Sequence, residues 1–346
     1  MKNTNLIIGK TNTGKTKGVL FNRVTKLIEN NENIFIMDQR GEYYKTFGET
    51  LKENNYNIKV VNFNNTLKSN GYNPLILPYK LYKDNKKDDA IQLIHDFAYE
   101  ICKEKSQVDP FWTNSAADYI TGLILIMFKN AKEEEINIGS LTMILNQSQM
   151  KKNDKTYLTE YLSKINLLED VYITLSGTAF APYETQASIL TVAKQKLNSI
   201  AMKENLINML STNDLDLTNL KEKTAIFVEG TSDVANIILD QTYYAIKNNG
   251  LSFNFIIDGI GNYSNILSLE DIIKNATYNN INLFITTVSQ EELNEIYGKN
   301  FENKFENIIN TPTDEPLIEY GTYNDYPKLK NEDKKYFNFI KFLKNK

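Results

Sequence analysis

An eight-residue loop near the start of the chain has the residue types that hold phosphate. Apolar residues 6–8 predict a strand before this loop, and residues 17–30 predict a helix after it. In such a loop, glycines let backbone amides curl around phosphate oxygens, a lysine reaches the β- and γ-phosphates, and a hydroxyl holds Mg²⁺. The pattern therefore predicts nucleotide binding, with ATP and Mg²⁺ as cofactors. The residues predicted to bind the cofactor are Gly9, Lys10, Thr11, Asn12, Thr13, Gly14, Lys15 and Thr16.

A phosphate site of this kind also needs an acid at the end of a buried strand to complete the surroundings of the metal. The mostly apolar segment 253–257 ends in Asp258, which lies far along the chain from the loop. We expect Asp258 and Thr16 to hold Mg²⁺. Lys15 and Asp258 are accordingly predicted to be catalytic.

Four more apolar segments predict the sheet that must position these residues. They cover residues 34–37, 58–63, 224–228 and 283–287, and helical patterns alternate with them. Near-continuous apolar strands indicate a parallel sheet covered on both faces, which predicts an α/β fold. Ligands of such folds bind at the carboxyl ends of the strands.

The chain divides by pattern into three parts. Residues 84–210 have helical periodicity without a convincing strand, and this predicts an all-α insertion. Residues 1–83 and 211–310 form the predicted nucleotide-binding domain around it. Residues 311–346 are predicted to be a polar, lysine-rich tail. Within the insertion, we expect Trp112 to anchor the core.

Composition limits the classes of function and partner. The net charge is −4, with 39 basic and 43 acidic residues, so any contact with DNA must be local. One histidine and one cysteine exclude a histidine-rich metal site and an internal disulfide. The chain has no run of 18 apolar residues and no signal-peptide pattern at its start. These features predict a cytoplasmic protein without a membrane span of its own.

Several motifs together resemble the type IV coupling proteins, the conjugative DNA-transfer ATPases related to FtsK-like and HerA-like translocases. The segment Asp38–Glu42 looks like that family's D-P-K-G-E motif, and Tyr72–Leu75 looks like its Y-N-P-L motif. Asp109–Trp112, followed by Ala116 and Ala117, is similar to its F-W-x-x-x-A-x pattern. Leu293–Gly298 resembles the end of its Q-S-x-x-Q-L-x-x-x-Y-G motif. The matches are collinear over about residues 5 to 300, and their order is more specific than any single motif.

The resemblance implies a RecA-like P-loop motor domain that carries an all-α domain. It further implies a homo-oligomer, a hexameric ring, that engages DNA or a relaxase–DNA complex. Components of a type IV secretion channel are the other implied partners, and they would recruit the chain to the inner face of the membrane. The family's amino-terminal membrane helices have no counterpart in this sequence, which begins at the predicted phosphate-loop strand.

Two positions depart from the family pattern. The acid that follows the metal-binding aspartate is replaced by Gly259, so a carboxylate that would orient the attacking water is absent there. The sensor glutamine falls on Val288, and Gln290 replaces it only if the register slips. Glu229 and Glu42 are alternative sources of the missing carboxylate.

Ring motors commonly use an arginine from a neighbouring subunit, and this chain has two arginines. Arg40 follows a predicted strand, whereas Arg23 lies within the first predicted helix. Arg40 is therefore the predicted catalytic arginine, and Glu229 completes the predicted catalytic set.

Three functions remain open from the sequence. The first is an ATP-hydrolysing motor of conjugative DNA transfer. The second is a nucleotide-binding, weakly or non-hydrolysing regulatory subunit of the same machinery, which the glycine at 259 and the valine at 288 favour. A kinase-like transferase with the helical insertion as a lid is a third reading, against which the motifs at 38–42 and 72–75 argue.

Overall fold

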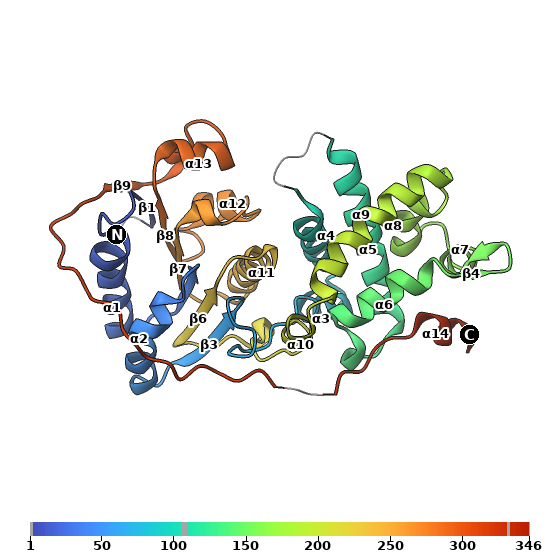
Figure 1. Ribbon diagram of the computed structural model, residues 1–346, viewed down its shortest axis with the longest axis horizontal. Helices are drawn as coiled ribbons and strands as arrows, with labels where there is room; N and C mark the ends of the chain where they lie inside the picture. Colours follow the sequence, from blue (N-terminus) through green and yellow to red (C-terminus); the bar gives the residue numbers. More distant parts are fainter. Residues whose placement is uncertain (1–2, 105–108, 331–332, 346) are drawn as a thin grey trace. The chain divides into compact units, whose positions relative to one another are not determined.

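The computed structural model describes residues 3–104, 109–330 and 333–345, and these form two compact units (Figure 1). The first unit comprises the described residues of Met1–Asn70 and Asp214–Leu329. The second comprises those of Gly71–Asn213 and Lys330–Lys346. Residues 1, 2, 105–108, 331, 332 and 346, which the predicted domains and tail include, lie outside the described residues.

A seven-stranded parallel sheet forms the centre of the first unit, and this confirms the predicted α/β fold with a parallel sheet. Each of the six strands predicted from the sequence is present. Strand β8 lies between β7, which ends in Asp258, and β1, which leads into the phosphate loop. In spatial order the strands are β3 (Asn57–Asn62), β6 (Thr224–Glu229), β2 (Ile34–Asp38), β7 (Phe253–Asp258), β8 (Ile281–Thr287), β1 (Thr4–Ile8) and β9 (Asn307–Asn310).

Helices cover both faces of this sheet, as its apolar strands require. One face packs against a helical turn at Lys15–Leu20, α1 (Phe21–Glu29) and α2 (Glu42–Glu53). Figure 1 shows α11 (Asp233–Asn249) and α12 (Leu269–Asn275) on the opposite face. A shorter helix, α13 (Gln290–Tyr297), follows β8. The two layers fix the positions of the strand ends, and the strand ends carry the predicted site residues.

Strand β9 was not predicted. It is a four-residue edge strand that pairs with β1 alone, and only Ile308 and Ile309 in it are apolar. Backbone hydrogen bonds to β1 form it, so its sequence carries little of the apolar pattern that identifies a buried strand.

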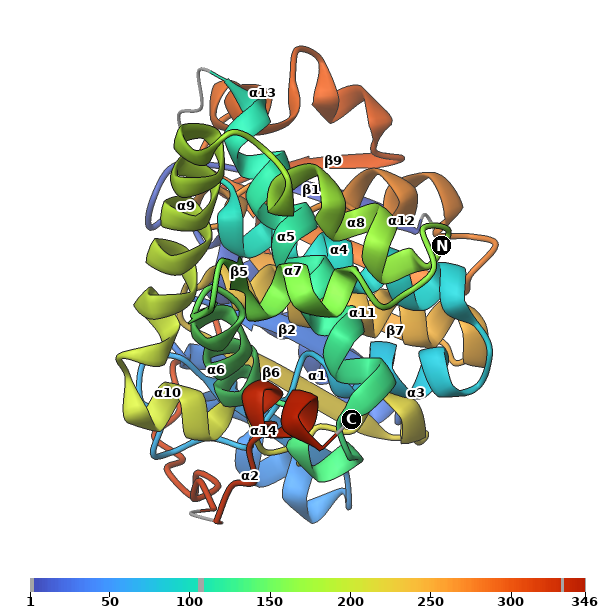
Figure 2. The same cartoon turned by 90° about the vertical axis from the view of Figure 1, so that its right-hand side faces the viewer.

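The second unit is helical, and α5 (Pro110–Asn130) is its most buried element. Residues 119–128 of α5 are buried, and α5 packs against α4 (Lys87–Cys102), α6 (Ile138–Ser148), α8 (Asp170–Ala179) and α9 (Tyr183–Ala201). Figure 2 shows α5 between α8 and α9. The remaining elements that the structure describes in this unit are α3 (Ile76–Lys83), a 3-10 turn at Glu133–Glu135, the hairpin β4 (Lys151–Lys152) and β5 (Lys155–Thr156), α7 (Tyr157–Leu162), α10 (Glu204–Met209) and α14 (Phe339–Lys344).

The helical unit begins before the expected boundary at residue 84. The backbone N–H of Tyr72 donates to the carbonyl of Met209 at 2.9 Å. The side-chain amide of Asn73 donates to the carbonyl of Ile136 at 2.7 Å. These long-range bonds attach residues 71–83 to the helices, although their local pattern does not reveal it.

The expectation that Trp112 anchors the helical core is wrong. Trp112 lies in the first turn of α5, is 37% exposed, and packs edge-on against Phe111. The buried face of α5 begins at Thr113 and Ala116 instead. Trp112 therefore lies at the margin of the buried face, not within it.

The expected tail does not form one part. Residues 311–329 run along α1 and α2 of the first unit, and Ile318 N–H donates to the carbonyl of Lys17 at 3.0 Å. Residues 333–345 belong to the helical unit, where Phe337 N–H donates to Ser140 Oγ at 2.9 Å. We call residues 311–329 the strap.

Among the helices that the structure describes, none is long and apolar enough to cross a membrane.

Candidate nucleotide-binding site

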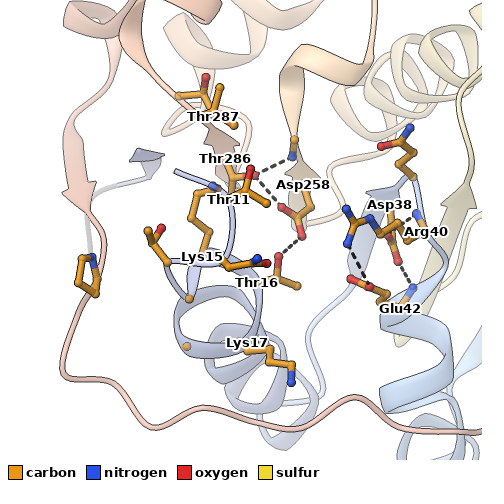
Figure 3. A pocket seen from close by; sticks show the side chains of 18 of the residues that line it. Thr11, Lys15, Thr16, Lys17, Asp38, Arg40, Glu42, Asp258, Thr286 and Thr287 are labelled. Atoms are coloured by element: carbon orange, nitrogen blue, oxygen red, sulfur yellow. Dashed lines mark hydrogen bonds and ion pairs between the residues drawn. The ribbon is translucent and has the colours of Figure 1, made fainter. Parts of the chain in front are cut away.

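A cavity of about 820 Å³ lies in the first unit, at the carboxyl ends of β1, β7 and β8 (Figure 3). Four loops and the strap line this cavity. The phosphate loop contributes residues 11–18, and the loop after β2 contributes Asp38, Gln39, Arg40 and Glu42. The segments after β7 and β8 contribute Asp258, Gly259, Gly261, Asn262, Thr286, Thr287, Val288 and Glu292, and the strap contributes Pro312, Thr313, Glu315, Leu317 and Tyr320.

The phosphate loop curls as its glycines predict. Gly14 has a φ of +88°, in the left-handed region that favours glycine, just before the helical turn that starts at Lys15. The Lys15 ammonium donates to the carbonyls of Gly9 and Lys10, and its Nζ lies 2.9 Å from the latter oxygen. Gly9 and Lys10 thus contact Lys15 rather than the cavity.

Burial lowers the pKa of Lys15, while the nearby carboxylates of Asp258 and Glu292 act in the opposite direction. The ammonium therefore sits among acids inside a partly buried loop. A polyphosphate entering the cavity would add negative charge beside Lys15 and stabilise its charged form.

The structure joins the two predicted metal ligands. Thr16 Oγ1 donates to Asp258 Oδ2 at 2.7 Å, although 242 positions separate the two residues in the chain. Asp258 also accepts bonds from Thr286 Oγ1, at 2.6 Å on Oδ1, and from Tyr43 Oη, at 2.9 Å on Oδ2. Figure 3 shows the carboxylate of Asp258 between Thr16 and Thr286.

These ligands fit Mg²⁺ that arrives with a nucleotide. Mg²⁺ favours oxygen ligands and is often held by one or two carboxylates, water and substrate phosphates. One carboxylate and one hydroxyl meet that description. In the part of the chain that the structure describes, no cluster of three or more histidine, cysteine, aspartate or glutamate side chains offers a protein-only metal site.

Arg40 lines the cavity and is 69% exposed, with Nη1 3.8 Å from Glu42 Oε1. Neighbouring Asp38 has a structural role, because its carboxylate accepts the backbone N–H groups of Arg40 at 2.9 Å and Tyr43 at 3.0 Å. Burial raises the pKa of Asp38 to about 6. Asp38 therefore fixes the turn that presents Arg40.

Glu229 is not among the residues that line the cavity. Its Oε2 accepts from Asn62 Nδ2 at 2.7 Å, and its Oε1 accepts from Tyr326 Oη at 2.9 Å. The residue is 2% exposed, and burial raises its pKa to about 7. The structure therefore does not bring Glu229 together with the other predicted catalytic residues.

Val288 and Gln290, the two alternatives for the sensor position, differ in whether they line the cavity. Val288 lines the cavity and is 43% exposed, whereas Gln290 does not line it. Leu293, which set that register, is fully buried. An apolar side chain thus stands at the position of the family's glutamine.

Sequence reasoning missed three contributors to the cavity. Thr286, the penultimate residue of β8, donates to Asp258, Glu292 lies in the first turn of α13, and the strap closes one side of the cavity. The sequence did contain a signal for Glu292. When the family's Q-S-x-x-Q-L-x-x-x-Y-G motif is aligned so that its first glutamine falls on Val288, its second glutamine falls on Glu292. No local pattern identifies the strap residues.

Comparison with solved structures shows the same fold. The bacterial conjugative coupling protein TrwBdeltaN70, in an unbound form, has a TM-score of 0.63 at 13% identity over 88% of this chain and 68% of that chain. TrwB in complex with ADP and Mg²⁺ has a TM-score of 0.63 at 13% identity over 88% and 70% of the two chains. TrwB with the ATP analogue ADPNP has a TM-score of 0.62 at 13% identity over the same shares. The fold of the first unit is therefore a RecA-like P-loop fold.

A search of curated proteins by sequence finds no match. The family model for type IV secretory system conjugative DNA transfer matches residues 3–241. This match spans more than half of the chain and includes the phosphate loop, strands β1, β2, β3 and β6 and most of the helical unit. The protein therefore belongs to the type IV secretory system conjugative DNA transfer family.

Proposed function

We propose that this protein is an ATP-driven motor of conjugative DNA transfer. It would hydrolyse ATP to move or recruit DNA, or a relaxase–DNA complex, to a type IV secretion channel. The observation that carries the proposal is the hydrogen bond from Thr16 Oγ1 to Asp258 Oδ2 at the floor of the cavity. Family membership and the likeness to TrwB, solved with ADP and Mg²⁺ and with ADPNP, support it.

Each side chain of the site has a role in this proposal. Backbone amides of residues 11–16 would hold the phosphates, and Lys15 would exchange the carbonyls of Gly9 and Lys10 for phosphate oxygens. Thr16 and Asp258 would hold Mg²⁺, which neutralises phosphate charge when bound. Catalysis of phosphoryl transfer is mostly positioning and charge stabilisation, and these groups supply both.

Arg40 is the proposed arginine of the reaction. Its guanidinium lines the cavity with Glu42 at 3.8 Å, and because the side chain is mostly exposed it remains accessible to phosphate. If Arg40 acts on the cavity of a neighbouring subunit, mixing Arg40→Ala and Lys15→Ala chains will restore turnover that neither variant has alone. If it acts on its own cavity, the mixture will remain inactive.

The decisive experiment measures ATP turnover by the full chain, with and without single- and double-stranded DNA. We expect Lys15→Ala to lower turnover by at least about 100-fold, because it removes the phosphate-binding cation. Lys26→Ala is the matched control, since Lys26 is an exposed lysine of α1 away from the cavity. Equal turnover by Lys15→Ala and wild type would reject the proposed site.

A regulatory, weakly hydrolysing subunit is the second candidate. The glycine after Asp258 and the valine at 288 favour it, because neither side chain can orient a water. This candidate would be selected if the wild type binds ATP but does not hydrolyse it, whether single- or double-stranded DNA is present. The binding should be lost in Lys15→Ala.

The partners are proposed as DNA or a relaxase–DNA complex, channel components and further copies of the chain in a hexameric ring. DNA binding at a local patch would give a falling line of log affinity against log salt. A mass measurement in the presence of Mg²⁺ and ADPNP tests the ring, and a monomer under those conditions would count against it.

A further inference from the structure

Asp258 cannot serve both as metal ligand and as the group that orients water. Its Oδ2 accepts two hydroxyls, from Thr16 and Tyr43, and its Oδ1 accepts the hydroxyl of Thr286. These bonds tie the carboxylate to the phosphate loop through Thr16, to α2 through Tyr43 and to β8 through Thr286. A hydrolytic site of this kind therefore needs a second acid.

Position 259 cannot readily supply that acid. Gly259 has a φ of +80°, where residues with a Cβ are strained. A Cβ built on it would lie 2.4 Å from Asn262 Nδ2, so Asn262 would have to move. The backbone after β7 is thus shaped for glycine.

The carboxylate of Glu292, from α13, lies against this same loop. A Cβ built on Gly261 would lie 2.0 Å from Glu292 Oε1 and 2.3 Å from Glu292 Cδ. The carboxyl group of Glu292 therefore lies directly over Gly261, in the turn that follows Gly259. Because Gly261 has no side chain, the space is available.

Glu292 is also held in place and faces the cavity. Its Oε2 accepts from Thr287 Oγ1 at 2.6 Å and from the backbone N–H of Val288 at 3.0 Å. Among the described residues, no donor bonds Oε1. The carboxylate lines the cavity near Lys15, where its charge partly offsets the lowering of the Lys15 pKa by burial.

We propose that Glu292 is the catalytic base of ATP hydrolysis, replacing from α13 the carboxylate that is missing after Asp258. Glu292 Oε1 accepts a proton from the attacking water as the water oxygen bonds to the γ-phosphorus. The bond from that phosphorus to the β–γ bridging oxygen breaks, and ADP and inorganic phosphate leave. This inference rests on the proposed function, since it assigns a residue to the hydrolysis proposed above.

A purely structural role competes with this one. The backbone N–H of Glu292 donates to Ser289 Oγ at 3.3 Å, so Glu292 belongs to the capped first turn of α13. Glutamine at this position retains an acceptor oxygen for Thr287 and Val288 but cannot accept the proton of water. Glu292→Gln therefore separates the catalytic role from the capping role.

The test uses the full chain with Mg²⁺ and ATP, and measures kcat, the Kd of a fluorescent ATP analogue and the thermal midpoint. We expect Glu292→Gln to lower kcat by at least about 100-fold, as loss of a general base does. The Kd should stay within about threefold and the midpoint should stay unchanged, because the hydrogen bonds that hold the turn survive. Glu291→Gln, at the exposed neighbouring position, is the matched control and should retain wild-type kcat.

The outcomes distinguish this inference from the proposed function. Turnover by Glu292→Gln within about threefold of wild type overturns the role of Glu292 and leaves the motor standing. A lower midpoint together with a weaker Kd in Glu292→Gln assigns the residue to capping and also overturns the inference. A wild type that binds ATP but shows no turnover overturns both.

Discussion

Acidic residues end strands in both halves of the sheet's carboxyl edge, but they face the cavity in one half and are buried in the other. Glu229, Asp38 and Asp258 end the adjacent strands β6, β2 and β7 and lie in one register row. Asp258 meets hydroxyl groups and the cavity, whereas Glu229 is buried between Asn62 and Tyr326. Asp38, in the middle, accepts backbone N–H groups of the turn at the start of α2.

This contrast shows that an acidic residue at a strand end can bind a ligand only if its hydrogen-bond partners leave its carboxylate facing the cavity. On the β7 side, β8 and β1 bring Thr286 and the phosphate loop to Asp258. On the β6 side, the strap delivers a tyrosine and closes the space around Glu229. The partners of each acid, rather than its position in the row, decide its role.

The sharpest way to break this comparison is to neutralise each acid and measure ATP turnover. We expect Asp258→Asn to lower turnover by at least about 100-fold, because it removes the proposed metal-binding charge. Glu229→Gln should retain turnover within about threefold, since the glutamate does not line the cavity. A large loss in both variants would show that the two halves act as one site.

The pH dependence of stability provides a second test. Burial raises the pKa of Glu229 to about 7 from a model-peptide value near 4.5, so the folded state holds a proton that the unfolded state has lost. Stability from this group is complete below about pH 4.5 and falls as the pH rises toward and through 7. Asp38, whose pKa is raised to about 6, contributes in the same direction.

Urea unfolding at pH 5 and pH 8 measures this contribution. We expect the wild type to lose on the order of 1 to 3 kcal/mol relative to Glu229→Gln between these values. Asp258→Asn is the comparison from the other half of the edge. An equal pH dependence in wild type and Glu229→Gln would show that Glu229 is not held as the structure describes.

The sequence was sufficient to predict six of the seven strands and to select Thr16 and Asp258, which the structure places in contact. The apolar strands, the phosphate loop and Asp258 each have a local pattern, and the structure brings Thr16 and Asp258 together. The order of strands has no such pattern, because crossovers between distant segments set it. That order explains why Glu229, as good a strand-end acid as Asp258 by sequence, lies two strands from it and outside the cavity.

The contribution of the C-terminal chain could not be predicted for a related reason. The strap has no secondary structure after β9, and single side chains and backbone groups attach it to the first unit. Tyr326, Tyr320 and Leu317 acquire their roles only from the surfaces on which they lie. A polar, turn-rich composition is compatible with a free tail as well as with a bound strap.

The smallest expected effect comes from a matched pair of tyrosine variants that sharpens the comparison. Tyr326 and Tyr43 each donate a phenol hydrogen bond to one of the two acids, at 2.9 Å in both cases. Tyr326→Phe should destabilise the fold by about 1 kcal/mol, more at pH 8 than at pH 5, because the lost bond favours ionised Glu229. ATP turnover should remain unchanged.

Tyr43→Phe should cost a similar stability, about 1 kcal/mol, but should also change turnover, since its hydroxyl bonds the same Asp258 oxygen as Thr16. Urea unfolding and turnover measured on both variants separate the two effects. If Tyr326→Phe altered turnover as strongly as Tyr43→Phe, the strap would transmit the state of Glu229 to the cavity. The two acids would then be coupled through Asp38, which lies between them in the same register row.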